Sequence, residues 1–261
     1  MDRCVERYET LLGTDFDGGT GADFEDVRRA GLEDPRHKDR VPELTALLED
    51  ADVPARRRFE AALALATWGE AAGYEAVVAA ARAPKDAPWY GTSADKLHAV
   101  DDSFAQLLGA VGDSAAAAEE KGTSRDRDAA LRALIRIADT EFFGDVPDRA
   151  IGAAEAGRLL PDIQKAVVRG CAALAAGSGP GFDLAPQLVE LASAVARSDE
   201  HAAVQLCVGV LATTSHAGVL RRAVTVVRRG SGADSRDLAE YVKSLADEET
   251  RALVEEAVAE S

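Results

Sequence analysis

Apolar residues recur every three or four positions along most of the chain, which is the spacing that lines one face of an α-helix. In VPELTALLED, residues 41–50, the residues on one face are Val41, Leu44, Leu47 and Leu48. A turn, DADVP, separates this segment from ARRRFEAALALATWG, residues 55–69, whose alanine and leucine stripe ends at a glycine. Glycine is typical of the C-terminal end of a helix. The pattern therefore predicts two helices that pack together as a hairpin.

A leucine recurs at a comparable place in later apolar segments. The six positions are Leu65, Leu108, Leu134, Leu174, Leu211 and Leu245. They are separated by 43, 26, 40, 37 and 34 residues, mostly within the range of about 33 to 47 residues of helical-pair repeats. We interpret DSAAAAEEKG, which lies in the short step, as a shortened outer helix. Since strand-like alternation with hairpin turns is lacking, we predict an all-α fold of about six irregular hairpins.

The segment around residue 58 resembles the HEAT-repeat family of α-solenoids. The residues that match the family pattern are Asp52, Arg58, Ala61, Ala62, Ala64, Leu65 and Gly69. Arg57 departs from it, because the family usually has valine there. The resemblance implies a right-handed α-α superhelix over residues 32–261, in which Asp52 and Arg58 make the hydrogen bonds typical of the family. The competing interpretation is an irregular helical bundle.

Residues 1–31 differ from the rest and are expected to form a separate N-terminal part. CVERYETLLG can form a short amphipathic helix, and TDFDGGTGADFED is expected to be a loop or a loosely held arm. The loop resembles a calcium-binding EF-hand loop only in part. Counted from Asp15, the twelve residues DFDGGTGADFED have Gly19 and Thr20 at the fifth and sixth positions and Asp26 at the twelfth, where the motif needs an oxygen ligand, glycine and glutamate. We therefore expect no calcium site.

The net charge of −16 at pH 7 narrows the choice of partner. Residues 1–120 contain 25 acidic and 13 basic residues, whereas residues 121–261 contain 21 and 17. An acidic protein repels nucleic acid and acidic lipid and attracts basic proteins. The charge therefore predicts a basic protein partner and makes nucleic acid an improbable ligand, although solubility alone is the simpler explanation. No segment has the length of about 18 apolar residues that a membrane span needs. We expect a cytoplasmic protein without membrane contact.

The sequence offers few catalytic candidates. The histidines and cysteines are His37, His98, His201, His216, Cys4, Cys171 and Cys207, and none has the spacing of a metal motif. Among them, His98 is the best placed, because Asp101 and Asp102 follow at helical spacing and could orient its imidazole or share a metal with it. Such a group is more often a solvated helix face. We expect a non-enzymatic protein without cofactor or metal; the alternative is a HEAT-like enzyme, or a lyase or chaperone, that acts on a small ligand or a modified protein.

The longest break between the expected helices is RAPKDAPWYGTSAD, residues 82–95. It contains Trp89 and Tyr90, which would be interface anchors if exposed or would seal a gap between hairpins if buried. Together with Asp101 and Asp102 they are our candidate partner-binding residues. Both interpretations of the tryptophan remain open.

Near the C-terminus, arginines form a possible basic stripe on one helix face. Its members are Arg221, Arg222, Arg228 and Arg229, and Arg56 and Arg57 could add to it. The stripe suggests a further alternative, a nucleic-acid-binding solenoid of the DNA glycosylase type. Four arginines on a helix are more often paired with neighbouring acids. The favoured hypothesis is a protein-protein interaction module, such as an acidic adaptor or an immunity-type protein that covers a basic partner.

Overall fold

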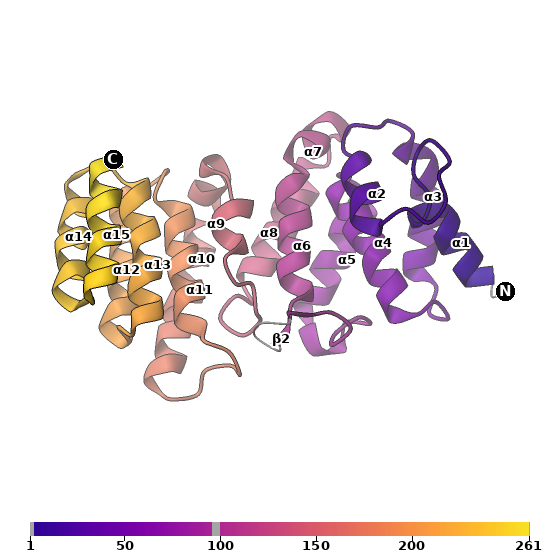
Figure 1. Ribbon diagram of the computed structural model, residues 1–261. Helices are drawn as coiled ribbons and strands as arrows, with labels where there is room; N and C mark the ends of the chain where they lie inside the picture. Colours follow the sequence, from indigo (N-terminus) through magenta and orange to yellow (C-terminus); the bar gives the residue numbers. More distant parts are fainter. Residues whose placement is uncertain (1–2, 96–99, 261) are drawn as a thin grey trace. The chain divides into compact units, whose positions relative to one another are not determined.

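A computed structural model of the protein describes residues 3–95 and 100–260. The chain is all-α: within the described residues it has fifteen α-helices, one short 3-10 helix and a single antiparallel pair of two-residue strands (Figure 1). It divides into two compact units, Met1–Leu134 and Ile135–Ser261, and each is described by itself. No helix in the described part of the chain combines the length and the apolar character needed to cross a membrane.

Several helices of the first unit fall on the predicted helical segments. The elements of this unit are α1 (Arg3–Leu12), α2 (Phe24–Ala30), α3 (His37–Glu49), α4 (Ala55–Thr67), α5 (Ala71–Arg82), η1 (Pro84–Asp86), β1 (Ala94–Asp95), β2 (Val100–Asp101), α6 (Ser103–Asp113), α7 (Ala115–Lys121) and α8 (Ser124–Ile135). The predicted hairpin is α3 and α4, which pack against each other. The expected shortened helix is α7, which is only seven residues long.

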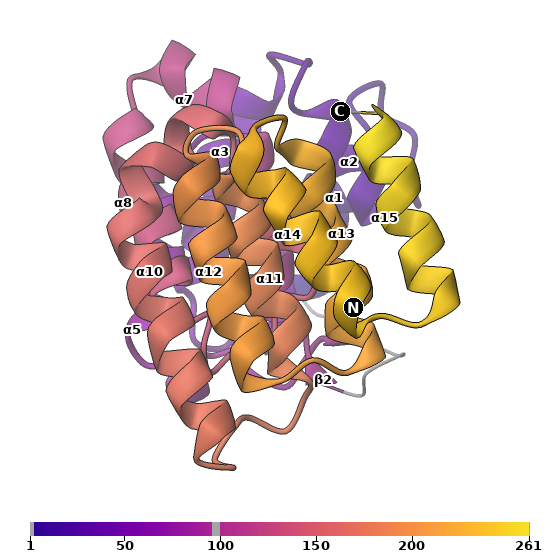
Figure 2. The same cartoon turned by 90° about the vertical axis from the view of Figure 1, so that its left-hand side faces the viewer.

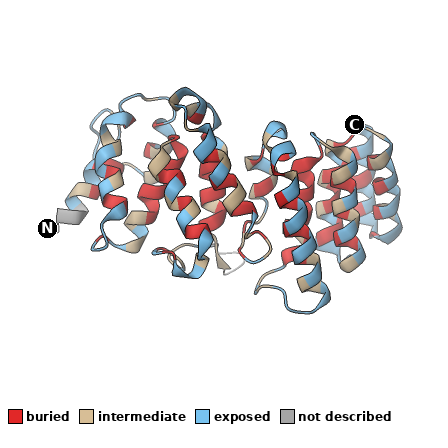
Figure 3. Cartoon of the chain, turned by 180° about the vertical axis from the view of Figure 1, so that it is seen from behind, coloured by how far each residue is buried: buried red, intermediate tan, exposed pale blue. Residues whose placement is uncertain are grey.

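Helix α4 forms the centre of the first unit. Every residue from Phe59 to Thr67 is buried, on all sides of the helix. Figure 3 shows in red the buried residues along the helices of each unit. A helix that is buried on all sides must be covered on all sides, and α4 packs against α2, α3, α5 and α6. Its alanines let these neighbours approach closely, because the methyl group adds little to the helix radius.

The N-terminal segment forms the expected short helix, α1, and of the two expectations for TDFDGGTGADFED the structure shows a loop, which ends where α2 begins, and not a loosely held arm. Leu12 of α1 is fully buried, and Val27 of α2 is almost so. The indole Nε1 of Trp68 donates a hydrogen bond of 2.8 Å to the carbonyl oxygen of Arg28. Residues 1–31 therefore belong to the first compact unit, Met1–Leu134.

The second unit contains the remaining helices. They are α9 (Val146–Ala150), α10 (Ala153–Ala175), α11 (Leu184–Val195), α12 (Glu200–Thr213), α13 (Ala217–Arg229), α14 (Ala233–Leu245) and α15 (Glu248–Glu260). From α10 onward, each helix packs against the next one and against the next but one, as Figure 2 shows for α12 and α14. The even-numbered helices thus form one layer and the odd-numbered helices the other. Helix α11 is buried along almost its whole length.

Candidate functional site

The segment that follows α5 folds back over the first unit and buries Trp89. The side chain is only 3% exposed. Its ring lies against Phe59 of α4, with ring centroids 5.8 Å apart and an angle of 41° between the planes. Of the two interpretations of Trp89, the structure therefore supports the buried plug and not the exposed anchor. Tyr90, the neighbouring candidate, is half-buried.

Asp101 and Asp102 hold this segment in place. Asp101 accepts hydrogen bonds from the backbone N–H of Gly91 (2.7 Å) and of Ser103 (3.1 Å). Asp102 accepts one of 3.1 Å from Gln106, whose amide also donates to Ser93 at 2.7 Å. Both carboxylates therefore join the loop to the start of α6.

The helical face expected for His98, Asp101 and Asp102 is not formed as predicted. Asp101 lies in β2, where Val100 and Asp101 pair with the antiparallel strand β1, and Asp102 directly precedes α6. Extended backbone does not bring residues three or four apart onto one face, which is the property on which the prediction depended. His98 itself lies outside the described residues.

A groove of about 480 Å³ opens beside Trp89, within the usual size range of ligand pockets. One wall is a face of α5 that carries small side chains at helical spacing, Ala72, Ala76, Ala79 and Ala80. The other walls come from the end of α3, from α4 and from residues 83–89. Alanine leaves this space open because its side chain reaches little beyond the helix backbone.

Three carboxylates surround the groove: Glu49, Glu75 and Asp86. All three are exposed, and none has a side-chain hydrogen bond or an ion pair with another residue that the structure describes. The cation among the lining residues, Arg58, donates from its Nε to the carbonyl oxygen of Leu48 at 2.9 Å. The rim of the groove is therefore acidic, and its wall is apolar.

The indole nitrogen of Trp89 is unusual in this setting. Within the described residues, its buried N–H has no hydrogen-bond acceptor. Trp68, the other tryptophan, has the carbonyl oxygen of Arg28 as its acceptor. Most buried polar groups in proteins have a partner, so the Trp89 N–H is a donor that a bound molecule could satisfy.

The three consecutive arginines at the start of α4 all have structural partners. Arg56 and Arg57 each bind the buried carboxylate of Glu60 at 3.0 Å. Arg57 also stacks on the ring of Tyr8, 3.6 Å from its centroid. Arg58 donates a hydrogen bond to the carbonyl oxygen of Leu48 within the α3–α4 hairpin, whereas the side chain of Asp52 has no partner among the described residues. Arg56 and Arg57 therefore do not contribute free charge to a nucleic-acid-binding surface.

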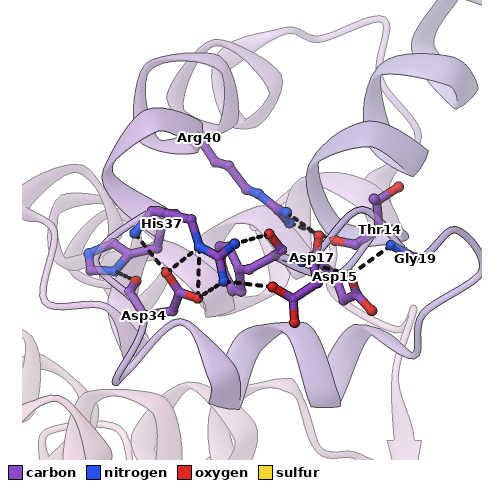
Figure 4. Close-up of polar contacts among 9 residues, drawn as sticks. Thr14, Asp15, Asp17, Gly19, Asp34, His37 and Arg40 are labelled. Carbon is purple, nitrogen blue, oxygen red and sulfur yellow. Dashed lines mark hydrogen bonds and ion pairs between the residues drawn. The ribbon is translucent and has the colours of Figure 1, made fainter.

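Two arginines of α3 and its N-terminal flank close the Gly- and Asp-rich loop, as Figure 4 shows. Arg40 donates to the carbonyl oxygens of Leu11, Thr14 and Asp15 at 2.7 to 2.8 Å. Arg36 binds Asp34 and lowers the pKa of that carboxyl to about 2. The carboxylate of Asp15 accepts the backbone N–H of Gly19, which lowers its pKa. Arginine side chains and backbone N–H groups of the protein therefore hold the loop whose sequence partly resembles a calcium-binding loop.

His37 belongs to a buried polar cluster next to this loop. Its Nδ1 lies 2.7 Å from the carbonyl oxygen of Asp34 and must therefore donate, so its Nε2 accepts from Lys121 at 2.8 Å. Lys121 also binds the carboxylate of Glu70 and the carbonyl oxygen of Trp68. Burial lowers the pKa of His37. These groups connect α3, α4, α5 and α7, and we interpret them as structural.

The four arginines of the basic stripe of α13 bind acids on three neighbouring helices. Arg221 binds Glu249 and Arg228 binds Glu260, both of α15. On the other side, Arg222 lies 2.8 Å from Glu190 of α11, and Arg229 binds Asp148 of α9. Each of the four candidate arginines is therefore paired with an acid, as solvated arginines on a helix usually are.

Sequence reasoning missed the groove carboxylates and the buried Glu190. A single glutamate within the apolar segment LAPQLVELASAV was the available signal for Glu190. The signal for the groove was weaker. It is the stripe of alanines on one face of α5, which contains no large apolar residue that would fill the space beside it. Cys207 is buried, and burial raises its pKa to about 12. In the part of the chain that the structure describes, no group of three or more His, Cys, Asp or Glu side chains could hold a metal ion.

No family model matches the sequence, and no curated protein or solved structure is significantly similar to it.

Proposed function

We propose that the protein is a non-enzymatic, HEAT-like helical-repeat protein that binds a basic protein partner, as an adaptor or an immunity-type protein does. The packing order of α10 to α15, in which each helix contacts the next and the next but one, supports the repeat assignment. The hydrogen bond from Arg58 to Leu48 within the α3–α4 hairpin supports it as well. A right-handed superhelix of about six hairpins remains part of this proposal.

The observation that carries the binding proposal is the contrast between acidic and basic side chains. The groove carboxylates Glu49, Glu75 and Asp86 have no partner among the described residues, whereas the arginines of the α13 stripe are all paired. The net charge of −16 acts in the same direction. A surface with unpaired negative charge attracts a basic protein and speeds its capture.

We place this binding in the cytoplasm. The described cysteines, Cys171 and Cys207, are free thiols, which suits a reducing compartment. The alternative enzymatic and nucleic-acid-binding functions have no specific support, because His98 lies outside the described residues and the α13 arginines are paired.

Affinity capture from the producing cells tests the proposal. The tagged protein should retain one basic protein in a fixed stoichiometry, and the purified pair should dissociate more readily as salt is raised, because salt screens exposed charges. An acidic partner, a complex equally tight at high salt, or no stoichiometric complex would count against it. If the purified protein converts a small molecule or a modified protein into a product, that result would favour the enzymatic alternative instead.

A further inference from the structure

We propose that the groove beside Trp89 is the docking site for an amphipathic segment of the basic partner, with apolar side chains against α5, lysines or arginines at the acidic rim, and an acceptor for the Trp89 N–H. This inference rests on the proposed function and adds to it the place of binding and the chemistry of the bound segment.

The wall of the groove favours aliphatic side chains. Ala72 and Ala76 are half-buried and Ala79 is exposed, so this face of α5 presents methyl groups to the groove. An aliphatic side chain, or the methylene stem of a lysine or arginine, would remove this apolar surface from water. The volume of about 480 Å³ is that of a ligand pocket, so several groups of one segment can enter.

The rim favours cationic groups and not a metal ion. Glu49 comes from the end of α3, Glu75 from α5 and Asp86 from η1, so the charges approach the groove from different elements. No group of three described carboxylates is close enough to hold a metal. Separate carboxylates around an apolar wall match separate basic residues on an amphipathic segment, and they repel phosphate groups.

The orphaned N–H of Trp89 is the second, independent indication of a ligand. Trp89 lines the groove, is 3% exposed and has no acceptor among the described residues. A backbone carbonyl or a polar side chain of the bound segment would supply that acceptor. Because the nitrogen is buried, we expect the lining of the groove around Trp89 to move when the segment binds. Trp68 already has an acceptor and should not respond.

The test uses the full-length ¹⁵N-labelled protein and a synthetic leucine-lysine amphipathic peptide of about 18 residues, or five helical turns. The protein has two tryptophans and therefore two indole N–H signals, which the W89F variant assigns. On titration, the Trp89 signal should move downfield as the N–H gains an acceptor, while the Trp68 signal stays in place. Two control peptides carry alanine for leucine or glutamate for lysine, and both should bind at least about tenfold more weakly.

Two matched triple variants distinguish the effect of the rim carboxylates on peptide binding from the effect of the net charge of the protein. E49Q/E75Q/D86N removes the rim charges and should weaken peptide binding about tenfold. D26N/E33Q/E119Q removes the same number of charges from exposed side chains of the first unit that also lack partners among the described residues and do not line the groove. At about 0.15 M salt it should change affinity by less than about twofold. The substitution A76L, which fills the groove, should weaken peptide binding when it is added to either triple variant.

The inference is overturned if the leucine-lysine peptide does not bind, if it binds without moving the Trp89 signal, or if both triple variants weaken it equally. Equal affinity for the alanine control peptide would also overturn it, because charge alone would then explain binding. A basic partner captured from cells that still binds the rim variant and A76L unchanged would overturn the inference and leave the proposed function standing. If no basic partner is captured from cells but the Trp89 signal still moves on titration with the peptide, the proposed function is overturned and the groove remains a binding site for an amphipathic basic segment.

Discussion

Glu190 is a buried acid on the most deeply buried helix of the second unit. Its side chain is 3% exposed, and its Oε1 lies 2.8 Å from Nη1 of Arg222, an ion pair without the geometry of a hydrogen bond. Burial raises the pKa of Glu190 to about 7, and the nearby carboxylates of Asp148 and Asp145 act in the same direction, against the charge of Arg222. Folding therefore favours the protonated form of this side chain.

We predict that E190Q becomes increasingly stabilising as the pH rises. Because the folded-state pKa lies above its usual value of 4.5, the native protein binds more protons between about pH 4.5 and pH 7. The wild-type protein therefore loses stability across this window, whereas E190Q lacks that loss. The free energy of unfolding of E190Q minus that of the wild type should rise by up to about 3 kcal/mol between these limits. Urea unfolding at several pH values measures it.

The control for this experiment is E256Q, which changes an exposed glutamate of α15 that has no partner among the described residues. The free energy of unfolding of E256Q should differ from that of the wild type by close to zero at every pH. A constant difference for E190Q across the whole pH range would contradict the prediction, because it would mean that Glu190 ionises alike in the folded and unfolded chain.

At the scale of single residues, the sequence identified Trp89 as a residue of interest but not its environment. Burial of a tryptophan depends on whether the following chain returns over it, and here that depends on Asp101 binding the N–H of Gly91, ten residues before it in the chain. Local periodicity carries no information on such a contact. The orphaned N–H and the unpaired rim acids likewise follow from three-dimensional packing.

Between elements, α5 lies very close to the backbone of α4 at Gly73. A Cβ atom at Gly73 would lie 2.3 Å from the backbone nitrogen of Ala66 and 2.6 Å from the carbonyl carbon of Leu65. Backbone atoms within a helix cannot move aside singly. Glycine is therefore required here by the helix contact, and this contact positions the alanine face of α5 that lines the groove.

We predict that G73A lowers the free energy of unfolding by about 2 to 3 kcal/mol, because α5 must shift away from α4. G209A is the matched control: Gly209 is exposed within α12 and a Cβ atom there would meet nothing within 4 Å. Since alanine favours helix over glycine, G209A should stabilise the protein by up to about 1 kcal/mol. Urea unfolding followed by circular dichroism compares the two. Equal effects of the two substitutions would show that the close approach is not restrictive.

The leucine spacing predicted the order of the helices better than their burial. The six leucines fall on α4, α6, α8, α10, α12 and α14, every second helix of the chain. Leu65, Leu108 and Leu134 are fully buried, and Leu211 is nearly so. Leu174 is only half-buried and Leu245 is 43% exposed. The interval between every second helix is visible in the sequence, but in the second unit the most buried helix is α11, which carries none of these leucines.

For the whole molecule, the distribution of charge has two separate effects on binding. Exposed charges act over a screening length of about 8 Å at physiological salt and about 30 Å at 0.01 M. At physiological salt, we therefore expect the proposed segment to be held by the carboxylates that line the groove, Glu49, Glu75 and Asp86. At low salt, the net charge of −16 also draws a cationic partner toward the protein.

We therefore predict that the two triple variants differ in how salt alters their kinetics. At about 0.01 M salt, D26N/E33Q/E119Q should slow association of the leucine-lysine peptide severalfold, and at about 0.15 M it should have little effect, because its charges act only at long range. E49Q/E75Q/D86N should also raise the dissociation rate at both salt concentrations, since the three carboxylates that it removes are expected to contact the peptide directly. Stopped-flow measurements with a labelled peptide give both rate constants. If the distant variant changed dissociation as much as the rim variant, the acidic surface would act as a diffuse field, and the groove would have no special part in holding the partner.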